Sequence, residues 1–322
     1  MKKMNLQIFA AAVVATVLSS CGGSNGGGEK SVNDGSFPMV SPPSYIRDQE
    51  QAVKYIARNF WDDFFKIGLD GKEKAGAVHG VDSLAFLNSF GMYAQLATMA
   101  GARTMEAPMA ELFKNLDSLA LNGERKPLLK VMEQMEHYFY DPNSPVLDEE
   151  IYLRALDGIL AAKSLTDVDK MQYEYQHRIC SLNRVGTPAA DFKFEQMKGK
   201  RGSLYGIKGD YTLIFFNNPG CNACKEILET IQASALEGMV SNGKLKILAM
   251  YIDGDVEAWE KNRGRYPEEW IYAHDAQMIL RDNNIYGLRA IPSLYLLDKE
   301  KRVILKDAPV GKVISYLQQQ TI

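Results

Sequence analysis

Two cysteines separated by two residues follow closely on an apolar run, and this arrangement constrains the fold more than any other feature of the chain. The run covers residues 211–216, and the pair is Cys221 and Cys224. A strand that ends in a turn and leads into a helix would bring both sulfurs to the first helical turn. Unpaired N–H groups there favour a negative charge on the first sulfur. Since the second sulfur can close onto the first, the spacing predicts a reversible disulfide and redox chemistry.

Length and composition are typical of a globular chain with more than one domain. The chain has 322 residues, whereas one domain usually has about 100–200. Hydrophobic residues make up 46% and charged residues 24%, which are ordinary globular values. The net charge of −3 gives no basis for a nucleic-acid partner. Four cysteines are too few for a scaffold held together by disulfides.

The N-terminus has the pattern of an export signal. Lys2 and Lys3 precede an apolar stretch, 6–18, that is too short to span a bilayer comfortably. The stretch ends in Leu-Ser-Ser before Cys21, which resembles the lipobox of bacterial lipoproteins. A glycine-rich tether, 22–28, follows. We therefore expect Cys21 to be acylated and to hold the protein on a lipid bilayer; the alternative is an ordinary signal peptide with a chance cysteine.

Changes in composition along the chain predict four segments. Residues 1–20 form the signal peptide, and residues 21–43 form a flexible linker that ends in prolines. Residues 44–181 form an all-α helical domain, and residues 182–322 form an α/β domain.

Apolar spacing predicts the helices of the first domain. Val53, Ile56, Phe60 and Phe64 recur three and four residues apart. The further helices are expected at about 84–97, 107–121, 126–140, 148–162 and 166–180.

Alternating strand and helix patterns predict the second domain. A buried strand at 211–217 and a strand at 245–252 enclose a helix at about 221–237. The remaining strands are expected at 193–197, 293–297 and 302–306, and the remaining helices near 256–263, 275–283 and 310–319. Strand–helix–strand units followed by a hairpin indicate a three-layer α/β domain.

Three elements make residues 184–322 resemble the thioredoxin superfamily, in its TlpA/ResA-like branch of anchored extracytoplasmic thiol–disulfide oxidoreductases. They are the lead-in 186–192, the pair Cys221 and Cys224 after a strand, and Ile291-Pro292 before the strand 293–297. The resemblance implies a central mixed sheet flanked by helices. The helical region resembles a domain of unknown function that precedes such modules in anchored lipoproteins.

The resemblance also implies the roles of the site residues. Cys221 would attack a substrate disulfide, and Cys224 would resolve the mixed disulfide. Pro292 would follow a cis bond, and Ile291 would offer backbone hydrogen bonds to an extended substrate. No cofactor is expected. The expected partners are exported protein disulfides or thiols and, as electron donor, a membrane-embedded thiol reductase. The expected location is the cell envelope of a Gram-negative bacterium, facing the periplasm.

The chain departs from the usual thioredoxin pattern at three positions. Gly220 replaces the aromatic residue before the first cysteine. Phe215 stands where many thioredoxins have a buried acid, and Ala249 stands where they have a lysine. The candidates left to accept the proton of the second cysteine are Tyr251, Asp253, Glu226 and water.

The dipeptide between the cysteines favours one direction of reaction. Asn222 and Ala223 bring no cation, and a strongly oxidising pair needs extra stabilisation of its thiolate. The sequence therefore favours a reductase over an oxidase.

Several alternatives remain open for the cysteines. A zinc site would need a second Cys or His pair at ligand spacing, and neither His79 nor His137 has one. A peroxiredoxin would need Thr where Asn218 stands. Cys180 is either a buried apolar residue or a third redox thiol.

A different class of function is also open. The protein would then be a non-catalytic lipoprotein that binds a partner through its helical domain, with a degenerate thioredoxin-like scaffold and a structural disulfide.

Overall fold

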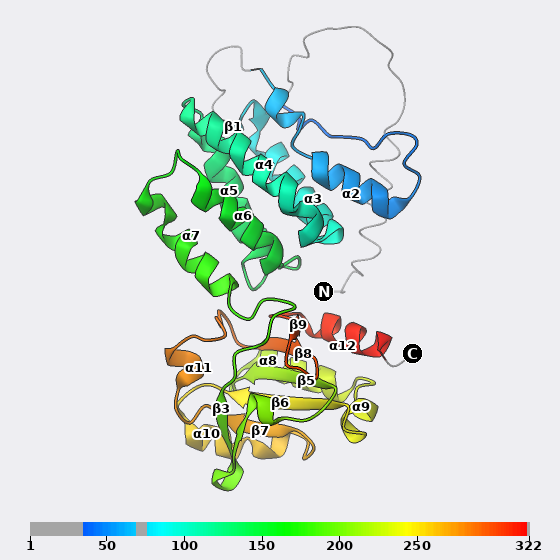
Figure 1. Ribbon diagram of the computed structural model, residues 1–322, viewed down its shortest axis with the longest axis vertical. Helices are drawn as coiled ribbons and strands as arrows, with labels where there is room; N and C mark the ends of the chain where they lie inside the picture. The colour runs from blue at the N-terminus through cyan, green and yellow to red at the C-terminus, as the bar shows by residue number, and fades with distance from the viewer. Residues whose placement is uncertain (1–34, 69–75, 321–322) are drawn as a thin grey trace. The chain divides into compact units, whose positions relative to one another are not determined.

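The computed structural model divides the chain into two compact units, Met1–His177 and Arg178–Ile322. It describes residues 35–68 and 76–320. The predicted signal peptide, Cys21 and most of the predicted linker lie outside the described residues. Figure 1 shows the helices and strands of both units.

The N-terminal unit is built from amphipathic helices, as predicted. Aspartate side chains cap three of them by accepting backbone N–H groups, at Asp48, Asp82 and Asp148. The helices are α2 (Gln49–Asn59), α3 (Ser83–Ala100), α4 (Ala102–Leu121), α5 (Arg125–Phe139), α6 (Glu149–Ala161) and α7 (Asp167–Cys180), the last of which runs across the division between the units.

A short antiparallel hairpin in this unit was not predicted. It pairs β1 (Ala77–Val78) with β2 (Val81–Asp82). The two turn residues, His79 and Gly80, have φ values of 49° and 78°. A two-residue hairpin turn needs positive φ at both central residues, and His79 and Gly80 supply it.

Phe37 shows that the predicted flexible linker ends earlier than residue 43. The ring is 7% exposed and packs against Phe60, Trp61 and Phe64, with ring centroids 5.1, 5.4 and 5.7 Å away. The prolines and glycines of this segment predicted a linker, but one buried aromatic ring is enough to fix part of it on the helical core.

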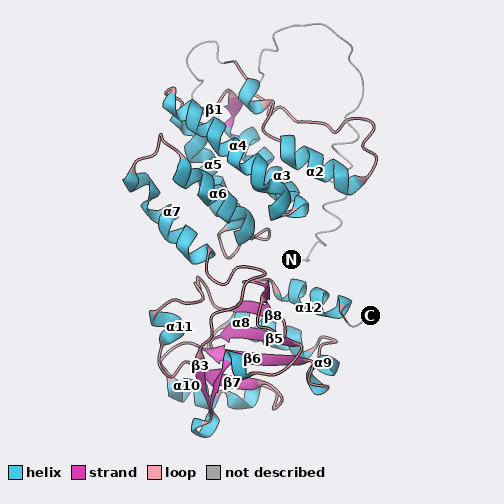
Figure 2. Ribbon diagram, viewed as in Figure 1, coloured by secondary structure: helices cyan, strands magenta, loops and turns pink. Residues whose placement is uncertain are grey.

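The C-terminal unit contains a seven-stranded mixed sheet, as the resemblance implied (Figure 2). Its order is β4-β3-β7-β6-β5-β8-β9. The central strands β5, β6 and β7 are parallel, and the outer pairs are antiparallel. The strands are β3 (Lys193–Gln196), β4 (Arg201–Ser203), β5 (Tyr211–Asn217), β6 (Leu245–Tyr251), β7 (Ile271–His274), β8 (Ser293–Leu297) and β9 (Val303–Leu305).

Two of these strands, β4 and β7, were missed by the sequence prediction. In β4, Arg201 pairs with Glu195 across an antiparallel ladder. Gly202 is the partner of Phe194 in this ladder. Glycine fits there because a Cβ would lie 2.6 Å from the ring of Phe194. Both strands are only three or four residues long, so their apolar alternation is too short to identify.

Helices and apolar clusters cover both faces of the sheet. One cluster joins the sheet to α8, α9, α10 and α12, and the other joins it to α11 and the segment before β3. These helices are α8 (Asn222–Gln232), α9 (Glu237–Ser241), α10 (Val256–Lys261), α11 (Ile279–Asp282) and α12 (Val310–Gln319). The predicted helix 221–237 is too long: α8 ends at Gln232, and the separate helix α9 begins only at Glu237. Among the residues that the structure describes, no helix has both the length and the apolar character needed to cross a bilayer.

Phe37→Ala should lower the free energy of unfolding of the helical unit by about 3 kcal/mol, because it empties a site lined by aromatic rings. Chemical denaturation of the full chain measures this loss. Met39→Ala is the matched control: its side chain is 38% exposed, so the change should stay within about 0.5 kcal/mol. Equal effects of the two substitutions would mean that Phe37 does not belong to the core.

Candidate active site

Cys221 and Cys224 lie where the central strand β5 passes into α8. Cys221 is the N-cap residue of α8, and its Sγ accepts a hydrogen bond from the backbone N–H of Cys224 at 3.2 Å. Cys221 is partly exposed, whereas Cys224 is 3% exposed. Both are free thiols in this structure. The two sulfurs therefore differ in access to solvent, as their predicted roles require.

Ile291 and Pro292 lie beside this pair. They open β8, which is the antiparallel neighbour of β5, and the peptide bond between them is cis. The carbonyl oxygen of Ile291 is 3.8 Å from the Sγ of Cys221 across 70 residues of sequence. The fold thus brings together the two segments that the sequence singled out separately.

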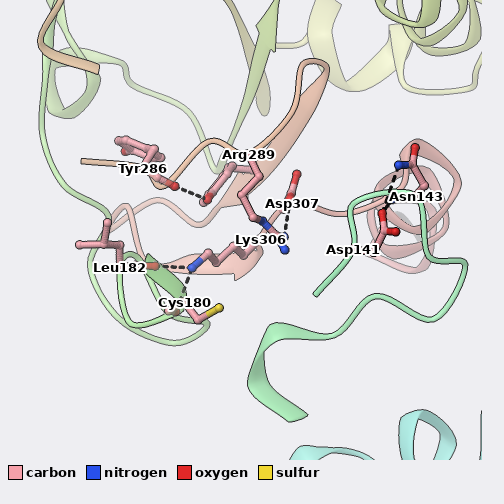
Figure 3. Close-up of polar contacts among 9 residues, drawn as sticks. Asp141, Asn143, Cys180, Leu182, Tyr286, Arg289, Lys306 and Asp307 are labelled. Atoms are coloured by element: carbon pink, nitrogen blue, oxygen red, sulfur yellow. Dashed lines mark hydrogen bonds and ion pairs between the residues drawn. The ribbon is translucent and has the colours of Figure 1, made fainter. Parts of the chain in front are cut away.

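An ion pair holds the loop that leads to Ile291. Arg289 Nη2 is 2.9 Å from Asp307 Oδ2, and the two side chains are only 11% and 18% exposed (Figure 3). A pair so well shielded from solvent is less screened than a surface pair. It ties the segment before β8 to the residues that follow β9.

Cys180, the third described cysteine, is 1% exposed. Its carbonyl oxygen accepts a hydrogen bond from Lys306 Nζ at 3.0 Å, and the same ammonium donates to the carbonyl of Leu182 (Figure 3). The backbone of Cys180 is therefore held in place at the start of the C-terminal unit, and its burial restricts the access of any partner thiol.

The pKa of the Cys224 thiol is raised to about 12, chiefly by burial. The hydrogen bond and the charge of Cys221 contribute to this rise, while the backbone of Asn218 opposes it. Cys224 is therefore a protonated thiol at neutral pH and has to lose its proton when it acts as a nucleophile.

The positions that hold a buried acid and a lysine in many thioredoxins are apolar here and fully buried. Phe215 and Ala249 are both 0% exposed. Of the predicted substitutes, Asp253 accepts a hydrogen bond from Asn218 and pairs with Arg281, and Glu226 is exposed. Burial, followed by the charge of Asp253, raises the pKa of the remaining candidate, Tyr251.

Two polar residues under the dithiol were not predicted. Asn217 is 0% exposed, and its Oδ1 accepts a hydrogen bond from the hydroxyl of Tyr266 at 2.8 Å. Burial raises the pKa of Tyr266 to about 12, and the charge of Cys224 adds to this shift. Asn217 was detectable as the first polar residue after the apolar run 213–216, whereas no local pattern connects Tyr266 with it.

Within residues 35–68 and 76–320, no three His, Cys, Asp or Glu side chains gather as ligands of one ion would.

Alkylation with iodoacetamide should label Cys221 before Cys224 at neutral pH. The labelling rate of Cys224 should rise roughly tenfold with each pH unit and level off only near pH 12, because the thiolate fraction follows its raised pKa. Cys221→Ala removes two of the raising causes, so Cys224 should react faster in that variant at a given pH. A rate for Cys224 that levels off near neutral pH would contradict the burial that the structure shows.

Comparisons with known proteins bear on both units. A thioredoxin-like protein from Bacteroides caccae ATCC 43185 has a similar structure with a TM-score of 0.79; the two chains share 28% identity, and the match covers 88% of this chain and 98% of that one. The C-terminal domain of an uncharacterized protein from Bacteroides fragilis NCTC 9343 is 44% identical over 42% of this chain and 98% of its own, with a TM-score of 0.41. The thioredoxin domain of a thiol-disulfide oxidoreductase from Bacteroides vulgatus is 18% identical over 43% of this chain and 99% of its own, with a TM-score of 0.37.

No protein with a curated description matches the chain. The family model described as "Domain of unknown function (DUF5106)" matches residues 18–183, which is more than half of the 322 residues. The C-terminal unit thus has the thioredoxin-like fold that its motifs predicted, and the chain as a whole belongs to the DUF5106 family.

Proposed function

We propose that this protein is a thiol–disulfide oxidoreductase that works through Cys221 and Cys224. The observation that carries the proposal is the geometry at Cys221. Its sulfur caps a helix, accepts the Cys224 N–H at 3.2 Å and lies 3.8 Å from the carbonyl of Ile291. A donor directed at the sulfur stabilises negative charge on it. Ile291 offers backbone groups next to the nucleophile, where an extended substrate can pair with them.

The reaction consists of two exchanges. The Cys221 thiolate attacks one sulfur of a substrate disulfide, the substrate S–S bond breaks, and the other substrate sulfur leaves as a thiolate. Cys224 then loses its proton to solvent and attacks the Cys221 sulfur. An intramolecular disulfide forms, and the second substrate sulfur leaves. Two electrons pass from the dithiol to the substrate, whose thiolates take up protons from water.

We propose the reductive direction because Asn222 and Ala223 place no cation beside the sulfurs. Each turnover leaves the pair oxidised, so an external dithiol has to restore it. A membrane-embedded thiol reductase is the proposed donor, and exported proteins with disulfides are the proposed substrates.

Cys224→Ala should trap substrates, because Cys221 can still attack but the mixed disulfide cannot be resolved. Non-reducing gels of envelope extracts should show covalent adducts that a reductant releases. Cys221→Ser is the matched control and should give neither adducts nor disulfide reduction. Adducts that persist in Cys221→Ser, or full reductase activity in that variant, would rule out the assigned roles.

The anchor is a separate part of the proposal and rests on the lipobox-like residues before Cys21 and the glycines after it. Cys21→Ser should move the protein from the membrane fraction to the soluble fraction or block removal of the signal. Fractionation and the mass of the mature protein measure this. An unchanged mass and an unchanged membrane fraction would refute acylation at Cys21.

A further inference from the structure

Three consecutive residues that precede Gly220 and Cys221 are each bonded to the same neighbouring segment. That segment is residues 252–270, called the β6–β7 connection below because it joins β6 to β7. The bonds involve Asn217, Asn218 and Pro219, so the whole approach to the nucleophile is held from one side.

Tyr266 makes the most buried of these bonds. Its hydroxyl donates to Asn217 Oδ1 at 2.8 Å, and both residues are buried. The amide of Asn217 also donates to the carbonyls of Phe215, at 2.8 Å, and Met250, at 3.4 Å. Since Phe215 belongs to β5 and Met250 to β6, the amide joins the ends of the two central strands. Burial makes each of these bonds costly to leave unmade.

Two further bonds hold the exposed part of the approach. Asn218 donates to the carboxylate of Asp253, which also pairs with Arg281. Arg265 Nη1 donates to the carbonyl of Pro219 at 3.2 Å. Gly220 follows without a side chain, so it adds no packing of its own. The α8 backbone holds Cys221 from one side, through the N–H groups of Cys224 and Lys225. From the other side Cys221 is held by these bonds and by its own N–H, which donates to the Asn218 carbonyl at 3.1 Å.

We propose that the β6–β7 connection is a clamp that aligns Cys221 for attack by Cys224, with Tyr266 and Arg265 as positioning residues. This inference rests on the function proposed above and assigns a role to a segment outside the cysteine motif. The clamp holds the approach through two donors, the Tyr266 hydroxyl and the Arg265 guanidinium, and one acceptor, the Asp253 carboxylate.

The two exchanges should depend differently on the clamp. In the first exchange a small disulfide comes from solvent and can adjust its own position to Cys221, so a small displacement of the loop costs little. In the second exchange both sulfurs belong to one chain, and their alignment is set by the loop on one side and α8 on the other. Intramolecular reactions lose rate steeply when the reacting atoms are misplaced. Loosening the clamp should therefore slow resolution while leaving the first attack nearly unchanged.

The reduced full chain, mixed with one equivalent of dithiobis(nitrobenzoate), separates these steps. Attack by Cys221 releases the first nitrothiobenzoate in a phase whose rate depends on concentration. Attack by Cys224 releases the second in a phase whose rate does not. Tyr266→Phe and Arg265→Gln should each slow the second phase on the order of tenfold and change the first less than about twofold. The Cys224→Ser variant identifies the second phase by abolishing it.

Two control variants distinguish a specific effect of the clamp from a general loss of structure. Tyr272→Phe removes a buried hydroxyl of the same cluster that donates to the Trp259 carbonyl. Lys261→Gln removes an exposed cation of the same connection, paired with Glu257. In both control variants the rate of the second phase should equal that of the wild type. Rates are compared among variants with equal denaturation midpoints. Equal slowing in Tyr272→Phe and Tyr266→Phe, or wild-type second phases in both Tyr266→Phe and Arg265→Gln, would overturn the clamp. A wild type that lacks the second phase would instead refute the dithiol function itself.

Discussion

The hydrogen bond from the Cys224 N–H to the Cys221 sulfur is the interaction on which the rest of the site depends. It makes Cys221 the cap of α8 and sets the distance between the two sulfur-bearing residues at one helical turn. The central strand β5 ends just before this cap. The segment that precedes its neighbour β8 places the carbonyl of Ile291 beside the same sulfur. The reacting sulfur is therefore also the group that caps α8, so the fold of the first helical turn fixes the position of the nucleophile.

Burial then separates the two thiols. Cys224 lies in the apolar cluster between α8 and the sheet, and burial is the main reason why its pKa is raised to about 12. The residues beneath it on β5 and β6, Phe215 and Ala249, are apolar. The site is therefore built from one accessible sulfur and one buried thiol, with apolar residues beneath the buried thiol.

Short sequence patterns predicted those parts of the fold that depend on residues close together in the chain. The apolar run before Cys221, the two-residue spacing and the Ile291-Pro292 pair each lie within a few residues, and they predicted the sheet, the helix and the site. Phe37 and Tyr266 could not be placed in this way, because the first depends on aromatic rings that follow α2 and the second on an amide 49 residues away. The strand β7 also depends on partners rather than on its four residues.

The central claim is that Cys221 and Cys224 form a reversible redox couple, and an equilibrium titration tests it most directly. The full chain would be incubated in buffers with graded ratios of reduced to oxidised dithiothreitol, quenched with an alkylating reagent and weighed by mass spectrometry. The account predicts that two thiols, mapped to Cys221 and Cys224, appear and disappear together in one two-electron transition. A pair that stays oxidised in every buffer, or thiols that never combine with each other, would contradict it.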